Sequence, residues 1–345
     1  MGCSKENIAL VDASMPTSVA WLHDIVDGFK AFQVLRAGFQ AGLFDWLEQH
    51  GPASKADIAS ALGLRGAHLG ALLQTMEELG LLDSSEGGYS LAAGMSAVLC
   101  QSSPWCQAGV LEALLRPASG WHDMGRFLSE TWQAAPAPAA PSLLLHPLFA
   151  EAQRLVVRYG QRQLERSSDA PMRTLLCFDG SDGLFAVMLC QRFPDLDVTI
   201  VVQPEAIAST EAAVATCGLA DRCRVQAGTP LESPVDGQYD QIVLFHSLYA
   251  VRKSVAAALA AVAGRLAPGG ELCSAHWFCQ EACKAAPGGL RDLDKAVITD
   301  SHPLCGVERF CPRLEEAGLA QAEQADLAGA FGTTKLHFAR RPASA

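Results

Sequence analysis

The chain has 345 residues, of which half are hydrophobic, and a formal net charge of -11. This length exceeds one typical domain and predicts about two. An acidic chain repels a phosphate backbone, so nucleic acid is not an expected partner. Because no window holds the roughly 18 apolar residues of a membrane span, we expect a cytoplasmic protein with no membrane partner.

The N-terminal part of the chain reads as helical. Residues 1–16 are expected to be a flexible terminus. From Thr17 to Leu47 apolar residues recur at helical spacing, which predicts helices buried on more than one side. Ser54 is placed to cap a helix over Lys55 to Leu62 by accepting a backbone N–H.

A winged-helix module is predicted next. A helix from Leu64 to Leu79 is followed by a short hairpin over residues 81–91 with a glycine turn. Such modules commonly read DNA, but this helix carries Glu77 and Glu78 beside Arg65. Residues 17–100 are therefore predicted to be a dimerisation domain.

Residues 101–170 are predicted to be a helical connector. The helical pattern of residues 94–132 ends at the proline-rich segment 133–141, which we expect to be a surface loop. A helix over Pro147 to Leu164 should lead into the second half.

From residue 171 to 345 the pattern predicts an α/β domain, in which short apolar runs alternate with helices as in a parallel sheet. Ligands of such doubly wound folds bind at the carboxyl ends of the strands. The expected strands are residues 174–178, 197–202, 223–227, 241–245 and 271–275, and the expected helices are residues 184–191, 206–216 and 255–266.

Several segments in this order resemble the caffeate-type and acetylserotonin-type O-methyltransferases. The resemblance includes residues 175–183, the Phe193-Pro194 pair, residues 266–270 and residues 316–319, and it spans about residues 17–338. It implies a winged-helix dimerisation domain before a Rossmann-like class I methyltransferase domain, which binds S-adenosylmethionine (SAM) and methylates a small molecule.

The resemblance also assigns a cofactor site, with departures. Asp179 and Ser181 stand where the family has glycine, so their side chains are expected to intrude. The acidic residue that holds the ribose is replaced by Val202, and a second carboxylate by Thr229, which implies a weakened site. The cofactor-binding residues implied are Asp179, Gly180, Ser181, Gly183, Gln203, Gly228 and Thr229.

The catalytic histidine of the family aligns with Leu248 in this sequence. His246 lies two residues earlier and could face the same side of the strand, because strand side chains alternate. His276 stands at the end of the next strand, where the family has glutamate. These two histidines are the candidate catalytic residues, and a buried, hydrogen-bonded histidine at a strand end is the alternative for His246.

The candidate substrate residues lie in the connector. They are Trp121, His122, Phe149 and Gln153. No metal is expected, because Cys279-x-x-x-Cys283 with Cys305 and Cys311 downstream is a loose ligand spacing. The scattered cysteines are expected to be reduced thiols.

Three functions remain open from the sequence. The first is methyl transfer from SAM to a thiol, thioether or amine, which already offers a reactive lone pair and needs no strong base. The second is a non-catalytic dimer or sensor, which the loss of family residues at Val202, Thr229 and Leu248 would explain. The third is different chemistry in the same pocket.

Overall fold

The computed structural model describes residues 14–132, 142–165, 173–233, 235–279 and 289–343. The chain divides into two compact units, residues 1–112 and 113–345, and each is described separately. The loop predicted at residues 133–141, the N-terminus up to residue 13 and Cys283 lie outside the described residues.

The first unit is a set of helices with one small hairpin. The predicted cap is confirmed, since Oγ of Ser54 accepts a hydrogen bond from the backbone N–H of Asp57 at 3.2 Å. Its core contains Leu43, Phe44 and Leu73, all at most 1% exposed. The elements are α1 (Ser18–Gln40), α2 (Leu43–His50), α3 (Lys55–Leu62), α4 (Gly66–Glu78), β1 (Leu82–Ser85), β2 (Gly88–Leu91) and α5 (Ser96–Leu99), and α6 (Ala108–Leu114) follows.

The expected burial of the first helix is wrong for its N-terminal half. Trp21 is 75% exposed, Ile25 72% and Phe29 62%. The residues of α1 that pack against the core of this unit, Val34, Leu35 and Phe39, lie in its C-terminal half. Among the described residues of this unit, the apolar face formed by Trp21, Ile25 and Phe29 is uncovered, which is costly in water.

The continuous helix expected over residues 94–132 is also wrong. The structure has only α5, α6 and α7 (Met124–Phe127) there, separated by turns. Pro104 and Pro117 fall in these turns, and proline cannot donate a helical hydrogen bond.

The second unit contains a seven-stranded sheet with the strand order β5-β4-β3-β6-β7-β9-β8. The expected parallel sheet is confirmed for β3 to β7, whereas β8 and β9 are antiparallel and were not anticipated. The strands are β3 (Thr174–Asp179), β4 (Asp197–Val202), β5 (Cys223–Ala227), β6 (Tyr239–Phe245), β7 (Leu266–His276), β8 (Ala320–Gly329) and β9 (Gly332–Arg340).

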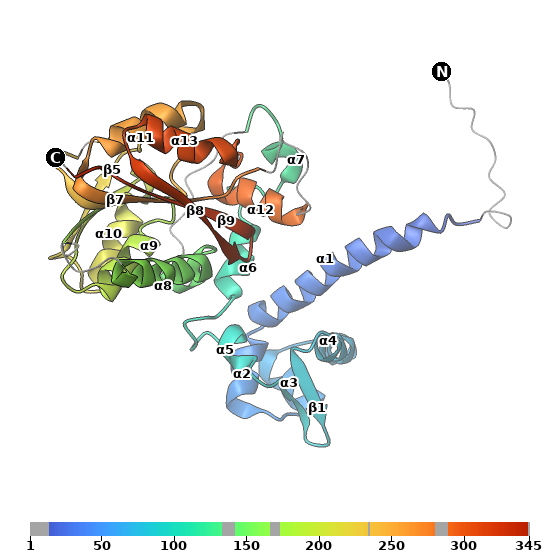
Figure 1. The fold of residues 1–345 in the computed structure, drawn as a ribbon. Helices are drawn as coiled ribbons and strands as arrows, with labels where there is room; N and C mark the ends of the chain where they lie inside the picture. Colours follow the sequence, from blue (N-terminus) through green and yellow to red (C-terminus); the bar gives the residue numbers. More distant parts are fainter. Residues whose placement is uncertain (1–13, 133–141, 166–172, 234, 280–288, 344–345) are drawn as a thin grey trace. The chain divides into compact units, whose positions relative to one another are not determined.

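Helices cover both faces of this sheet. Figure 1 shows α8, α9 and α10 on one face and α11 and α13 on the other. The helices are α8 (Phe149–Glu165), α9 (Leu184–Arg192), α10 (Ile207–Thr216), α11 (Val255–Ala263), α12 (Leu290–Thr299) and α13 (Phe310–Glu316); short 3₁₀ helices are η1 (Leu143–Leu145), η2 (Pro204–Ala206), η3 (Arg252–Ser254) and η5 (Val307–Arg309).

From β3 the chain adds β4 and β5 on one side of the sheet and then β6 and β7 on the other. The switch point therefore lies between β3 and β6, and ligands of doubly wound folds bind at such a point. The loops after β3, β4, β5 and β6 therefore converge at one edge of the sheet. Among the described residues, none of the helices combines the length and apolar character that crossing a membrane requires.

Candidate functional site

The loop after β3 is tied together by the carboxylate of Asp179. Its Oδ1 accepts hydrogen bonds from the backbone N–H of Ser181 at 2.8 Å and from the Ser181 hydroxyl, and its Oδ2 accepts from the N–H of Ala186 at 2.9 Å. Burial raises the pKa of Asp179, although these hydrogen bonds oppose the shift. The expected intrusion is therefore wrong: Asp179 is 4% exposed and Ser181 0%, and both turn inward to hold the start of α9.

The two glycines of this loop are required by close contacts. A Cβ on Gly180 would lie 2.4 Å from the carbonyl oxygen of His246, and the N–H of Gly180 donates to the carbonyl of Phe245 at 2.7 Å. Gly183 has a φ of 82°, and a Cβ there would lie 2.4 Å from Cγ2 of Thr210. The loop after β3 is thus packed directly against the end of β6.

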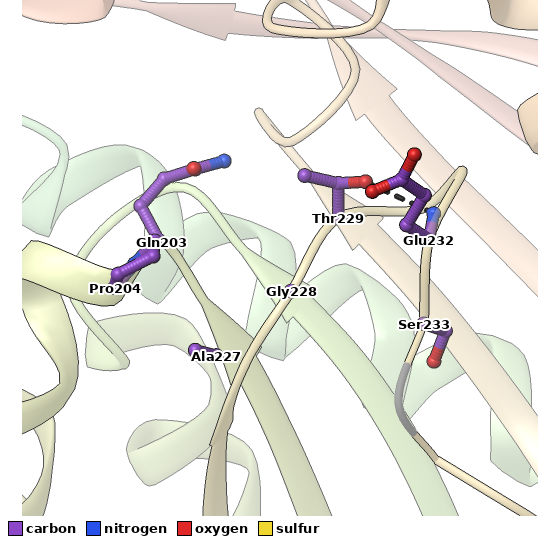
Figure 2. A pocket seen from close by; sticks show the side chains of 7 residues that line it. All are labelled: Gln203, Pro204, Ala227, Gly228, Thr229, Glu232 and Ser233. Carbon is purple, nitrogen blue, oxygen red and sulfur yellow. Dashed lines mark hydrogen bonds between the residues drawn. The ribbon is translucent and has the colours of Figure 1, made fainter.

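An open pocket of about 510 Å³ lies at the carboxyl ends of β4 and β5. Figure 2 shows the side chain of Gln203 extending toward Thr229, with Gly228 between them. Three predicted cofactor residues therefore meet in one pocket. Its lining is Gln203, Pro204, Ala227, Gly228, Thr229, Glu232 and Ser233.

The sequence analysis missed Glu232 at this pocket. A turn brings it there, because the backbone N–H of Glu232 donates to Oγ1 of Thr229 at 3.0 Å and the N–H of Thr229 donates to the carbonyl of Glu232 at 3.3 Å. Val202 is 2% exposed and contributes no polar group. Glu232 therefore offers the pocket a carboxylate from a position where the sequence pattern gave no signal.

Negative charge gathers between this pocket and the glycine loop. Burial, followed by repulsion from Asp179 and Glu205, raises the pKa of Asp182 to about 6. Asp182 has a φ of 53°, a conformation that asparagine also tolerates. A cationic ligand would relieve this repulsion.

Asp182→Asn should make the protein more stable above pH 6 by on the order of 1–2 kcal/mol, after allowance for partial solvent screening. The folded state binds the proton of the Asp182 carboxyl more tightly than the unfolded state does. In the wild type this binding stabilises the fold below about pH 4, and the stabilisation is lost as pH rises to about 6. Urea unfolding at several pH values measures the effect. The exposed Asp195→Asn is the control, and equal pH profiles for both variants would contradict the prediction.

His246 lies at the end of β6 and is 4% exposed, with a φ of 47°. Its Nε2 lies 2.7 Å from Oε1 of Glu151 on α8, and its Nδ1 lies 2.7 Å from the hydroxyl of Tyr249. The Tyr249 oxygen accepts a hydrogen bond from the backbone N–H of Trp277 at 2.7 Å, so the Tyr249 proton can be donated to Nδ1. Both ring nitrogens of His246 are therefore engaged.

The pKa values of its partners agree with this proton arrangement. Burial would raise the pKa of Glu151, but the interaction with His246 and the hydrogen bond from Thr334 outweigh it, so the net shift is downward. Burial also holds the pKa of Tyr249 well above its ordinary value. An ionised Glu151 that accepts from the Nε2–H of His246 and a neutral Tyr249 follow from these directions.

His276 is completely buried at the end of β7. Its Nε2 accepts hydrogen bonds from the backbone N–H groups of Ser247 at 3.1 Å and Leu248 at 3.0 Å, so Nδ1 carries the proton and donates to Oγ of Ser274 at 2.9 Å. Burial and the neighbouring His246 lower the pKa of His276 well below its ordinary value. His276 is thus a neutral ring that fixes the backbone after His246.

The candidate substrate residues occupy two segments. Trp121 and His122 lie before α7, and Trp121 hydrogen-bonds to Asp294 of α12. Phe149 and Gln153 lie on α8, where Phe149 packs against the core and Gln153 is exposed. The inward-facing polar residue of that helix is Glu151, which the sequence analysis did not single out.

Comparison with known proteins identifies the class of fold. A helical unit followed by this mixed sheet defines the class I methyltransferase fold with an N-terminal dimerisation domain. Residues 23–102 match the family model of the O-methyltransferase dimerisation domain, and the chain is similar in sequence to methyltransferases.

Two sequence relatives come from Streptomyces. The chain is 25% identical over 230 residues to a 3-hydroxy-5-methyl-1-naphthoate 3-O-methyltransferase of Streptomyces sahachiroi, covering 65% of this chain and 66% of that protein. It is 24% identical over 254 residues to an L-tyrosine C(3)-methyltransferase of Streptomyces lavendulae, covering 67% of this chain and 66% of that protein. The matches thus span slightly less than two thirds of each relative.

A solved structure shares the fold. Human N-acetylserotonin methyltransferase in complex with SAM has a TM-score of 0.63 and 19% identity, over 96% of this chain and 99% of that chain. The fold that the sequence resemblance implied, a dimerisation domain before a class I methyltransferase domain, is confirmed.

Proposed function

We propose that the chain is a SAM-dependent methyltransferase whose acceptor is a small molecule with a ready lone pair, such as a thiol, thioether or amine. The observation that carries the proposal is the pocket at the ends of β4 and β5, which unites Gln203, Gly228 and Thr229 in a methyltransferase fold. This is the edge of the sheet where doubly wound folds bind nucleotides.

Charge supports a cationic cofactor. SAM carries a sulfonium and an ammonium group, and carboxylates of Asp182, Glu205 and Glu232 belong to the loops after β3, β4 and β5. Like charges held together favour a cationic ligand that neutralises them. We infer that Glu232 takes over part of the polar contact that Val202 cannot make, which leaves the cofactor site weakened but present.

The histidine geometry supports the choice of acceptor. His246 and His276 use both ring nitrogens within the protein, so in this arrangement neither offers a lone pair to a substrate proton. A general base must lie within hydrogen-bond reach of the proton it removes. Catalysis by either histidine stays a prediction, and acceptors that need no base fit the arrangement better than phenols.

We also propose a homodimer. The uncovered apolar face of α1 begins at Trp21 and continues through Phe29 into the dimerisation domain at residues 23–102. Covering such a face is the usual source of association free energy. Analytical ultracentrifugation measures whether 36.5 kDa chains pair in solution.

Cofactor binding tests the proposed function. Calorimetry should detect binding of SAM and of S-adenosylhomocysteine, and Glu232→Gln should weaken SAM binding roughly tenfold, because a hydrogen bond to a charged group is lost. Glu211→Gln, a change at another exposed glutamate, which lies on α10, is the control and should bind SAM as the wild type does. No binding at millimolar concentrations of either compound would overturn the proposal and leave a non-catalytic dimer or sensor.

Turnover with labelled SAM then separates the acceptor classes. Transfer to thiol and amine acceptors should exceed transfer to phenols under the same conditions. A preference for phenols, lost in His246→Ala, would instead establish His246 as a base. An activity of the pocket that consumes no SAM would establish altered chemistry.

A further inference from the structure

Three side chains of metal-binding types, which are separated in the sequence, meet at the surface of the second unit. One donor atom each from Cys279, His302 and Cys305 lies within 4.8 Å of the others, and the two Sγ atoms are 3.0 Å apart. This cluster is separate from the pocket at the ends of β4 and β5, which none of the three residues lines.

The backbone builds this cluster. Phe278 and Leu304 form a parallel bridge, in which the N–H of Cys279 donates to the carbonyl of Leu304 at 2.8 Å and the N–H of Leu304 donates to the carbonyl of Trp277 at 3.0 Å. Trp277 is 1% exposed and Leu304 3%, so both sides of the bridge are anchored in the core. Cys279 directly follows Phe278 and Cys305 directly follows Leu304, so the bridge holds the two cysteines close together.

One ring nitrogen of His302 is held by the backbone, which leaves the other available to a metal. Nδ1 of His302 lies 2.8 Å from the carbonyl oxygen of Pro303, so a neutral ring donates its Nδ1–H there and keeps the lone pair on Nε2. Metal-binding histidines usually donate their other ring N–H to a carbonyl or carboxylate in this way. This contact also fixes the rotation of the ring.

We propose that Cys279, His302 and Cys305 supply three ligands of a Zn²⁺ site. Two thiolates and one imidazole suit zinc, whereas Mg²⁺ and Ca²⁺ prefer oxygen ligands. Two sulfurs bound to one tetrahedral zinc lie about 3.8 Å apart, so the pair needs to open by less than about 1 Å from the observed arrangement. Cys305 and His302 are exposed, which gives an ion access to the cluster.

Zinc binding is measured on the full-length chain, kept reduced with a phosphine, stripped by a chelator and reloaded. We expect one Zn²⁺ per chain by mass spectrometry of the metal, and visible absorption bands of thiolate-bound Co²⁺ when cobalt replaces zinc. Zn²⁺ should also raise the melting temperature, because it ties Cys279, in the segment after β7, to residues 302–305.

Variants make the assignment specific. Cys305→Ser and His302→Ala should each lower the zinc affinity by at least roughly tenfold. Loss of a residue that only hydrogen-bonds to a metal ligand already has an effect of this size, and loss of the ligand itself should have no smaller one. Cys311→Ser, a change at a nearby cysteine outside the cluster, should leave the affinity unchanged. Retention of full affinity in Cys305→Ser, or a Cys279–Cys305 disulfide in air-oxidised protein combined with no zinc uptake by the reduced chain, would overturn the proposal.

Discussion

Glu151→Ala is expected to lower the free energy of unfolding by about 3–5 kcal/mol, the largest effect of a single substitution that we predict. Glu151 is 3% exposed, and its Oε1 accepts hydrogen bonds from His246 and Thr334. Truncation leaves both donors buried without an acceptor and opens a cavity beside them. Urea unfolding followed by tryptophan fluorescence measures the loss.

Two further variants bracket this effect. Glu151→Gln keeps an oxygen that can accept from His246 and should cost less, about 1–2 kcal/mol, which also provides a measurement if the alanine variant does not fold. Gln153→Ala, at an exposed position of the same helix, should change stability by less than about 0.5 kcal/mol. A Glu151→Ala variant as stable as Gln153→Ala would show that the buried pair contributes nothing.

Gly180→Ala should destabilise the protein by about 2–3 kcal/mol, because the added carbon has no room. It would lie 2.4 Å from the carbonyl oxygen of His246 and 3.0 Å from that of Phe245, both of which are backbone atoms. The loop after β3 would have to move away from β6, and SAM binding should weaken in parallel. Denaturant unfolding and calorimetry on the same sample report the two effects.

Gly160→Ala is the matched control for this substitution. Gly160 is buried within α8 of the same unit, and the closest atom to an added Cβ is Cζ of Phe193 at the ordinary distance of 3.7 Å. Because alanine favours a helix over glycine, this variant should be as stable as the wild type or more so. Equal stabilities of the two alanine variants would refute the steric argument at Gly180.

The parallel strands and the first helices could be predicted because local signals and tertiary structure agree there. β4 and β5 have the bounds that the sequence pattern predicted, and Ser54 caps α3 as its side-chain chemistry requires. The antiparallel β8 could not be found in this way. Its sequence, Ala320–Gly329, lacks β-branched and aromatic residues, so it becomes a strand through pairing with β9 rather than through its own propensity.

The candidate site was partly predictable for a similar reason. Gln203, Gly228 and Thr229 follow strand ends directly, so topology alone brings them together. The partner of His246 could not be inferred, because Glu151 precedes it by 95 residues and lies on a helix with no motif. The inward turn of Asp179 depends on the free N–H groups of the following turn, which only the folded backbone positions.

The position of β9 between β7 and β8 has a consequence for synthesis of the protein on the ribosome. β9 is the last described strand in the chain, yet it pairs with β7 on one side and β8 on the other, and it carries Thr334, which donates to Glu151. A nascent chain that ends before residue 332 therefore exposes the unpaired edge of β7, and such edges invite aggregation. The sheet can be completed only after β9 has been synthesised. Until then a molecular chaperone would have the exposed edge of β7 to shield.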